Sequence, residues 1–309
     1  MEAMKRVLLA LATGAVFVFC SEWVFWSASN REALCVGEAV MTWGAYSILA
    51  FAFLCIVTVF RVRGIGALFL AGSVFGWLAE GVVVRTMYDD FPLNLSWTGL
   101  AWHALLTVVV GWYLVRRALL AHRPLRTLAL GVLLGIGWGT WAIFWWVEKK
   151  AVTPLPFFAG YAFLSGLLLI GGHWGWDRLR GFRFRPSRTE RWLVGLFLAA
   201  IFVFGVLPKR PVAVAILPPL ILLVWFALRR NRVVERRADL VSWGLSGRAR
   251  PVDYLCLLAI PAAAVAVYAG ATRLSLRIPT GWAVYLATVF TGAFMFVASV
   301  VSLLRKRGE

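Results

Sequence analysis

Ten apolar stretches, each close to 20 residues long, follow one another through this 309-residue chain. Because an α-helix rises about 1.5 Å per residue, about 20 residues cross the roughly 30 Å hydrocarbon layer of a bilayer. Backbone groups in lipid must be satisfied within the segment, so each stretch is expected to be helical. We therefore predict an all-α, polytopic integral membrane protein. The predicted spans are residues 7–26, 39–60, 64–84, 97–115, 127–147, 154–173, 192–208, 211–228, 253–271 and 281–303.

Composition agrees with this class, and charge predicts the orientation. The chain is 61% hydrophobic and 15% charged, whereas soluble domains average about 25% charged residues. With the N-terminus inside, the inner segments hold 24 of the 32 basic residues and the outer segments hold 8. The positive-inside rule then places both termini in the cytoplasm, and we expect a bacterial or archaeal plasma membrane.

The net charge of +18 has a membrane explanation. Cytoplasmic Arg clusters attract anionic lipid headgroups, at about 1 kcal/mol per basic residue near the surface. The predicted partners are thus the lipid bilayer and anionic headgroups, and no nucleic acid is needed to explain the charge. No Cys or His spacing typical of a metal site occurs, so no metal ligand is assigned and the cofactor stays unknown.

The two halves of the chain differ in composition. Residues 1–150 hold 11 of the 17 tryptophans and most of the acidic residues placed in the membrane. Residues 151–309 hold most of the arginines. We interpret the chain as an acidic, Trp-rich half of five helices with an outward-facing pocket, followed by an Arg-rich half of five helices. An odd number of spans in each half inverts one half relative to the other, as in transporters built from inverted repeats.

Three ionisable side chains are predicted at one depth in the first half. Helix rise places Glu22, Glu80 and His103 roughly 6–9 Å below the outer boundary of the hydrocarbon. Ionisable groups at this depth are costly, face cavities or partners, and often mark functional sites. We therefore expect Glu80 to handle protons, with His103 as its partner and Glu22 nearby. If they share a site, Glu80 and His103 must lie within about 12 Å of each other, roughly two turns of a helix.

Helical spacing adds an aromatic wall to these residues. Trp77 lies three residues before Glu80, and Trp26 lies four residues after Glu22, so each pair shares a helix face. Trp141 and Trp145 share a face in the same way, and Ser96 precedes His103 by seven residues. The predicted pocket is lined by Glu22, Glu80, His103, Trp77, Trp141 and Trp145, with Trp26 and Ser96 as further substrate-binding positions.

Three functions are compatible with such a pocket. A buried carboxylate beside a histidine can act as a general acid or base, or hold Zn²⁺, in a membrane-embedded enzyme that acts on a lipid-like or apolar substrate. Embedded acids also couple protons or cations in secondary transporters, and ten helices with cytoplasmic termini are similar in architecture to the drug/metabolite transporter superfamily. Alternatively, the acids are paired and the chain is a scaffold or a non-catalytic subunit of a membrane complex.

Three short motifs occur in an order similar to that of the intramembrane CAAX-type glutamic proteases. That family carries Glu-Glu-x-x-x-Arg, then Phe-x-x-x-His, then His-x-x-x-Asn/Asp. The corresponding segments here are Glu80–Arg85, Gly99–His103 and His173–Asp177. Gly81 replaces the second Glu and Gly99 replaces the Phe. The resemblance implies a protease site that joins Glu80, His103 and His173, whereas helix rise separates the two histidines by about 20 Å.

Overall fold

The computed structural model describes residues 1–29, 35–234, 239–276 and 280–305, and its regular elements in these ranges are helical. In chain order they are α1 (Glu2–Val18), η1 (Phe19–Trp23), α2 (Val24–Trp26), α3 (Val36–Val59), α4 (Ile65–Leu78), η2 (Ala79–Val83), η3 (Thr86–Tyr88), η4 (Leu95–Leu114), α5 (Val115–Leu120), α6 (Pro124–Glu148), α7 (Leu155–Arg178), α8 (Arg188–Ala200), η5 (Ile201–Val206), α9 (Ala213–Val234), η6 (Leu240–Gly244), α10 (Pro251–Leu257), α11 (Ala259–Arg273) and α12 (Thr280–Arg305). The segment η3 is a 3₁₀ turn, and the other η segments are π-helical.

Ten helical stretches of the described residues are long and apolar enough to cross a membrane, and each overlaps one predicted span. This confirms the predicted all-helical, multi-pass architecture. Local sequence explains several helix starts. Pro124 opens α6, where its missing N–H is not needed. Ser187 and Glu190 form a capping box at the start of α8.

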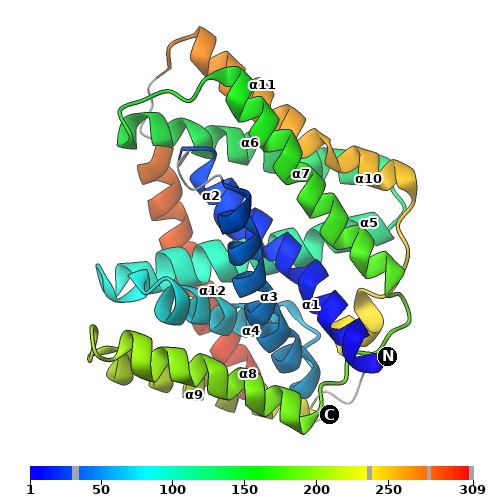
Figure 1. Cartoon of the computed structure of the whole chain (residues 1–309), viewed down its shortest axis with the longest axis vertical. Coiled ribbons are helices and arrows are strands. Elements are labelled where there is room, and N and C mark those ends of the chain that lie inside the picture. Colours follow the sequence, from blue (N-terminus) through cyan, green and yellow to red (C-terminus); the bar gives the residue numbers. More distant parts are fainter. Residues whose placement is uncertain (30–34, 235–238, 277–279, 306–309) are drawn as a thin grey trace.

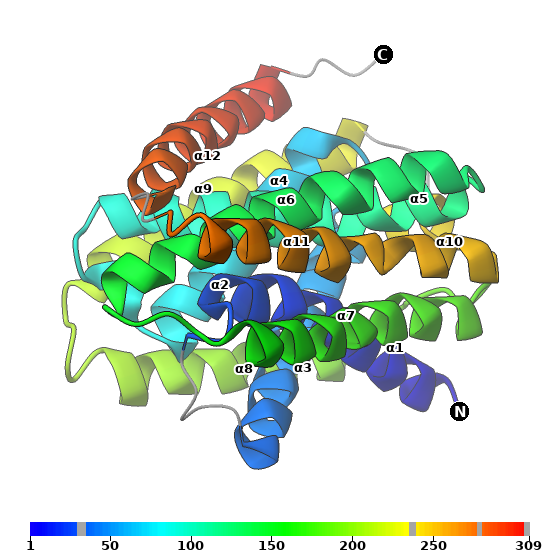
Figure 2. The same cartoon turned by 90° about the horizontal axis from the view of Figure 1, so that it is seen from above.

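The helices form a bundle in which α6, α7 and α11 lie along one side and the α8–α9 hairpin along the other (Figure 1). Between them lie α1, α3, α4 and η4. The start of α1 and the end of α12 point toward the same side in both views (Figures 1 and 2). Below, "inner end" means the bundle end that the arginine distribution assigns to the cytoplasm, and "outer end" means the opposite one.

The third span, Ile65–Val83, forms the centre of the bundle. In an apolar stretch of 18 residues within this span, 83% is buried. In the seventh span, Arg188–Val206, only 11% of the corresponding stretch is buried, and this span lies at the edge of the bundle. Small residues let the central helices approach closely, as is common in membrane bundles. A Cβ added at Gly76 would lie 3.0 Å from the carbonyl carbon of Gly99, and one at Gly139 would lie 2.6 Å from the carbonyl oxygen of Ala264.

The contact between α1 and α3 leads to a prediction for stability. A Cβ at Gly14 would lie 2.8 Å from the Cα of Ser47, so the Gly14→Ala variant must push the two helices apart. We expect a loss of about 1–3 kcal/mol, the usual cost of overpacking, seen as a lower midpoint of thermal unfolding in detergent micelles. Gly137 on α6 has no atom within 4 Å of an added Cβ, so Gly137→Ala is the control. Equal shifts in the two variants would contradict the close contact.

Candidate functional site

Glu80 and His103 form a buried pair between η2 and η4. Glu80 Oε1 lies 2.8 Å from His103 Nε2, and the two residues are 8% and 2% exposed. The predicted proximity of these side chains is confirmed. When Glu80 is ionised, its carboxylate accepts from the N–H at His103 Nε2. The hydroxyl of Thr86, at the start of η3, donates to the other carboxylate oxygen.

The pair continues into α1 through hydroxyl groups. With its proton on Nε2, His103 accepts at Nδ1 from the Ser21 hydroxyl, 2.9 Å away. Ser21 Oγ also lies 2.9 Å from Thr107 Oγ1, one turn below His103 on η4. The ring of Tyr46, on α3, lies 6.4 Å from the His103 ring, measured between centroids. Four helices thus meet at one polar cluster inside an otherwise apolar bundle.

Glu22 is the other carboxylate of this cluster. Tyr46 donates its hydroxyl hydrogen to Glu22 Oε1 over 2.5 Å, and Trp26 Nε1 donates to Oε2 over 3.0 Å. Tyr46 therefore contacts Glu22 through its hydroxyl, and its ring lies beside the ring of His103. We call the series Glu22, Tyr46, Ser21, His103 and Glu80 the polar chain.

The polar chain is carried largely by π-helical turns. Ser21 and Glu22 lie in η1, Glu80 in η2, and His103 in η4. A π-turn widens the helix by one residue, which redirects side chains and occurs frequently at functional sites. The loop after η2 supports its turn, because the Tyr88 hydroxyl donates to the carbonyl of Gly81 over 2.9 Å. Burial raises the pKa of Tyr88 to about 12, so this donor stays protonated at neutral pH.

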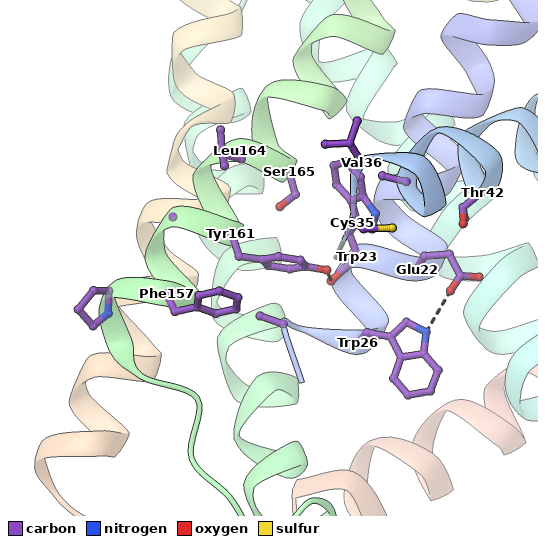
Figure 3. A pocket seen from close by; sticks show the side chains of 14 residues that line it. Glu22, Trp23, Trp26, Cys35, Val36, Thr42, Phe157, Tyr161, Leu164 and Ser165 are labelled. Carbon is purple, nitrogen blue, oxygen red and sulfur yellow. Dashed lines mark hydrogen bonds between the residues drawn. The ribbon is translucent and has the colours of Figure 1, made fainter. Parts of the chain in front are cut away.

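A groove of about 550 Å³ opens beside Glu22. It lies between the outer part of the first span and the outer ends of α3 and α7, and Figure 3 shows its labelled side chains. The lining residues are Glu22, Trp23, Trp26, Ala28, Cys35, Val36, Ala39, Thr42, Pro156, Phe157, Gly160, Tyr161, Leu164 and Ser165. Val36 and Leu164 are exposed on the sides of their helices, so the mouth of the groove is apolar.

The bundle is closed on the inner side of this groove. Gly14 on α1 packs against Ser47 on α3, as described above. A Cβ added at Gly172 on α7 would lie 2.8 Å from the carbonyl oxygen of Ala12 and from a methyl carbon of Val16. The first span is therefore in close contact with both helices that flank the groove, and the groove ends in the outer half of the bundle.

The tryptophans chosen from the sequence separate into two groups. Trp26 lines the groove, and its ring stacks on Trp145 with 5.0 Å between centroids. Trp141 and Trp145 both donate to the carbonyl of Phe25, over 2.6 and 2.7 Å, within a buried aromatic cluster. These two rings support α2 from behind and do not line the groove.

Trp77 and Ser96 also lie elsewhere. Trp77 is 0% exposed, packs against Phe296 of α12 at 5.3 Å between centroids, and points its indole N–H toward the carbonyl of Leu95 at 3.4 Å. The change from α4 to the π-turn η2 separates it from Glu80, although regular helical spacing puts both on one face. Ser96 donates to the carbonyl of Val289 over 2.6 Å.

Several residues of the site escaped the sequence analysis. Ser21 contacts both His103 and Thr107, and Tyr46 contacts Glu22. One signal was present on the second span, where Glu38, Thr42 and Tyr46 recur every four residues on one helix face. Of these, Thr42 lines the groove and Tyr46 reaches the polar chain. Nothing comparable in the sequence singles out Tyr161, whose hydroxyl donates to the carbonyl of Trp23 over 2.8 Å.

His173 and Asp177 belong to a different cluster at the inner end. Arg116 is 1% exposed and donates to Asp177 Oδ1 over 2.7 Å. It also donates to the carbonyl of His173 over 3.2 Å. The structure therefore does not bring His173 and Asp177 together with Glu80 and His103, as the similarity to CAAX-type proteases would require.

Among the described residues, no group of three His, Cys, Asp or Glu side chains is arranged to hold a metal ion. Cys20, Cys35, Cys55 and Cys256 are free thiols. No protein-family model, curated protein or solved structure matches the chain. Its function is therefore argued from its own residues.

Proposed function

We propose that this multi-pass membrane protein is an enzyme that performs acid–base chemistry on an apolar or lipid-like substrate in the outer half of the bilayer. The observation that carries the proposal is the position of Glu22. Its carboxylate lines the groove and accepts a hydrogen bond from Tyr46, whose ring lies beside His103 of the buried Glu80–His103 pair. A reactive group that faces the substrate and has hydrogen-bonded partners behind it suits general acid–base catalysis.

In this proposal each member of the polar chain has a separate task. Glu22 is the catalytic residue, because it is the carboxylate among the described residues that line the groove. Tyr46 and Trp26 hold its two oxygens in place. Ser21 and Glu80 hold the two ring nitrogens of His103, which lies beside the Tyr46 ring. Glu80 and His103 are thus positioning groups behind the substrate site.

The shape of the groove favours an enzyme over a carrier. An enzyme that acts on lipid needs a lateral opening and a closed inner side, whereas a carrier needs a path toward the cytoplasm. The apolar mouth between α3 and α7, and the close packing of Gly14 and Gly172 on the inner side, fit the first description. A drug/metabolite-type transporter and a scaffold are the alternatives, and both predict that wild-type protein leaves lipids unchanged.

The proposal keeps the orientation that the charges predict. Both termini are then cytoplasmic, in the plasma membrane of a bacterium or archaeon, and the groove faces the outer leaflet. The inner end carries the arginine clusters, which suit anionic headgroups.

A bulky side chain introduced into the groove tests the proposal. Gly160 on α7 lines the groove, and no atom lies within 4 Å of a Cβ built on it. Gly160→Phe should therefore fold normally but fill the substrate space, lowering turnover at least tenfold. The measurement is mass spectrometry of lipids in proteoliposomes made from a total lipid extract, sampled over time.

Gly171→Phe is the matched control. Gly171 lies on the same helix, also has no atom within 4 Å of an added Cβ, and does not line the groove. This variant should keep wild-type turnover. If wild-type protein converts no lipid in the extract, or if both variants are equally active, the proposal is wrong.

A further inference from the structure

We infer that the groove binds an organic ammonium group, such as the alkylammonium or quaternary ammonium head of an amphiphile. This inference builds on the proposed function and names the chemical class of its ligand. It starts from the residues at the closed end of the groove, where a carboxylate and indole and phenol rings line the same space.

Three rings line the same groove as Glu22. Trp23 and Trp26 lie one and four residues further along the first span, and Tyr161 approaches from α7 (Figure 3). The ring centroids of Trp23 and Tyr161 are 6.5 Å apart. Aromatic faces attract cations through the ring quadrupole, most strongly for Trp, and such cages recognise quaternary ammonium groups.

These side chains are held in place by other contacts. Tyr161 is fixed by its bond to the Trp23 carbonyl, and Trp26 by its bond to Glu22 and its stacking on Trp145. A binding site whose side chains are already ordered loses little conformational entropy when the ligand binds. The indole N–H of Trp26 and the hydroxyl of Tyr161 are already engaged in these hydrogen bonds, and one face of Trp26 is covered by Trp145.

Charge and shape agree with an amphiphilic cation. Among the described lining residues, Glu22 contributes the formal charge, so an ammonium group would be balanced by one carboxylate. The volume of about 550 Å³ exceeds what one headgroup needs and leaves room for the start of an alkyl chain. The exposed side chains of Val36 and Leu164 at the mouth would contact the rest of that chain within the bilayer.

The experiment compares three photoreactive probes that share a dodecyl chain bearing a diazirine. Their headgroups are trimethylammonium, hydroxyl and sulfate. The protein is held in phosphatidylglycerol nanodiscs, which contain no ammonium lipid that would compete. Labelled peptides are mapped by mass spectrometry, and affinities are measured by competition with unlabelled probe. We expect the trimethylammonium probe to label residues 36–42 and 156–165 and to bind about tenfold more tightly than the hydroxyl probe.

Two substitutions separate specific binding from general attraction. Glu22→Gln should weaken the trimethylammonium probe about tenfold and leave the hydroxyl probe unchanged. Glu38→Gln, which removes an exposed carboxylate from the first turn of α3 outside the lining, should change neither. Trp23→Leu should weaken the cation several-fold, whereas Trp23→Phe should retain part of the affinity. Thermal unfolding of each variant checks that it is folded.

Binding and turnover are separate readouts here. The inference is wrong if the hydroxyl or sulfate probe labels the groove as tightly as the cation does. It is also wrong if Glu22→Gln and Glu38→Gln bind the cation equally well. Selective cation binding without any lipid turnover would support the ligand class and contradict the proposed enzyme. Turnover of a neutral lipid without cation selectivity would support the proposed enzyme and contradict the ligand class.

Discussion

Glu22→Gln should lower the turnover of the proposed enzyme by about 100- to 10,000-fold, the range that general acid–base groups contribute. The amide keeps an acceptor for Tyr46 or Trp26 and nearly the same volume, but it cannot exchange a proton. The loss should therefore appear as a lower kcat with little change in the midpoint of thermal unfolding. The measurement is initial-rate lipid turnover in proteoliposomes, with detergent-solubilised protein used for the unfolding curve.

Two further variants show whether the loss is specific. Glu38→Gln removes a carboxylate of the same outer layer and should leave turnover unchanged, because the side chain is exposed and outside the groove. Glu80→Gln should have a smaller effect than Glu22→Gln, since Glu80 acts through His103 and Ser21 rather than on the substrate. If Glu80→Gln removes all activity and Glu22→Gln removes none, the assigned roles are wrong.

Arg116→Met should destabilise the fold by about 3–5 kcal/mol, the usual cost of removing one partner from a buried ion pair. Arg116 links three segments at the inner end, namely α5, α7 and residues 245–247. Besides Asp177 and the carbonyl of His173, its guanidinium donates to the carbonyls of Leu245 and Gly247, over 3.2 and 2.9 Å. Its loss leaves these carbonyls without a donor and leaves a charge on Asp177, which is 7% exposed. Thermal unfolding in a mild detergent measures the effect.

The neighbouring arginine provides the control for this experiment. Arg117 is exposed and donates to the Tyr113 hydroxyl over 3.1 Å, so Arg117→Met should change stability by less than about 1 kcal/mol. The double variant Arg116→Met/Asp177→Leu should regain part of the loss, because it removes both buried charges. Rescue will be incomplete, since Tyr254 and the backbone N–H of Ala249 lose their acceptor on Asp177. Equal unfolding midpoints for the two single variants would contradict this account.

Much of the membrane architecture was predictable, because it depends on local properties. Each span needs an apolar run of a certain length, and the ten predicted spans overlap the ten observed ones. Depth follows from helix rise in the same way, which is why Glu80 and His103 were expected to lie near each other and do. Their direct contact at 2.8 Å was not predictable from depth alone.

The aromatic part of the site shows where helical spacing is insufficient. Spacing places Trp141 and Trp145 on one face of α6, and they do share a target, the carbonyl of Phe25. Spacing does not tell which helix that face meets. It also assumes 3.6 residues per turn, an assumption that does not hold where α4 becomes the π-turn η2 between Trp77 and Glu80.

By itself, the sequence determined a helical membrane protein with ten spans and led to the prediction that three ionisable side chains share one depth, because hydrophobic length and helix rise act along a single segment. Only the tertiary structure decided how these side chains are joined. Helix rotation, π-turns and close glycine contacts depend on packing between segments distant in sequence. They bring Tyr46 into contact with Glu22 and Ser21 into contact with His103, and they place Glu22, rather than Glu80, on the wall of the groove.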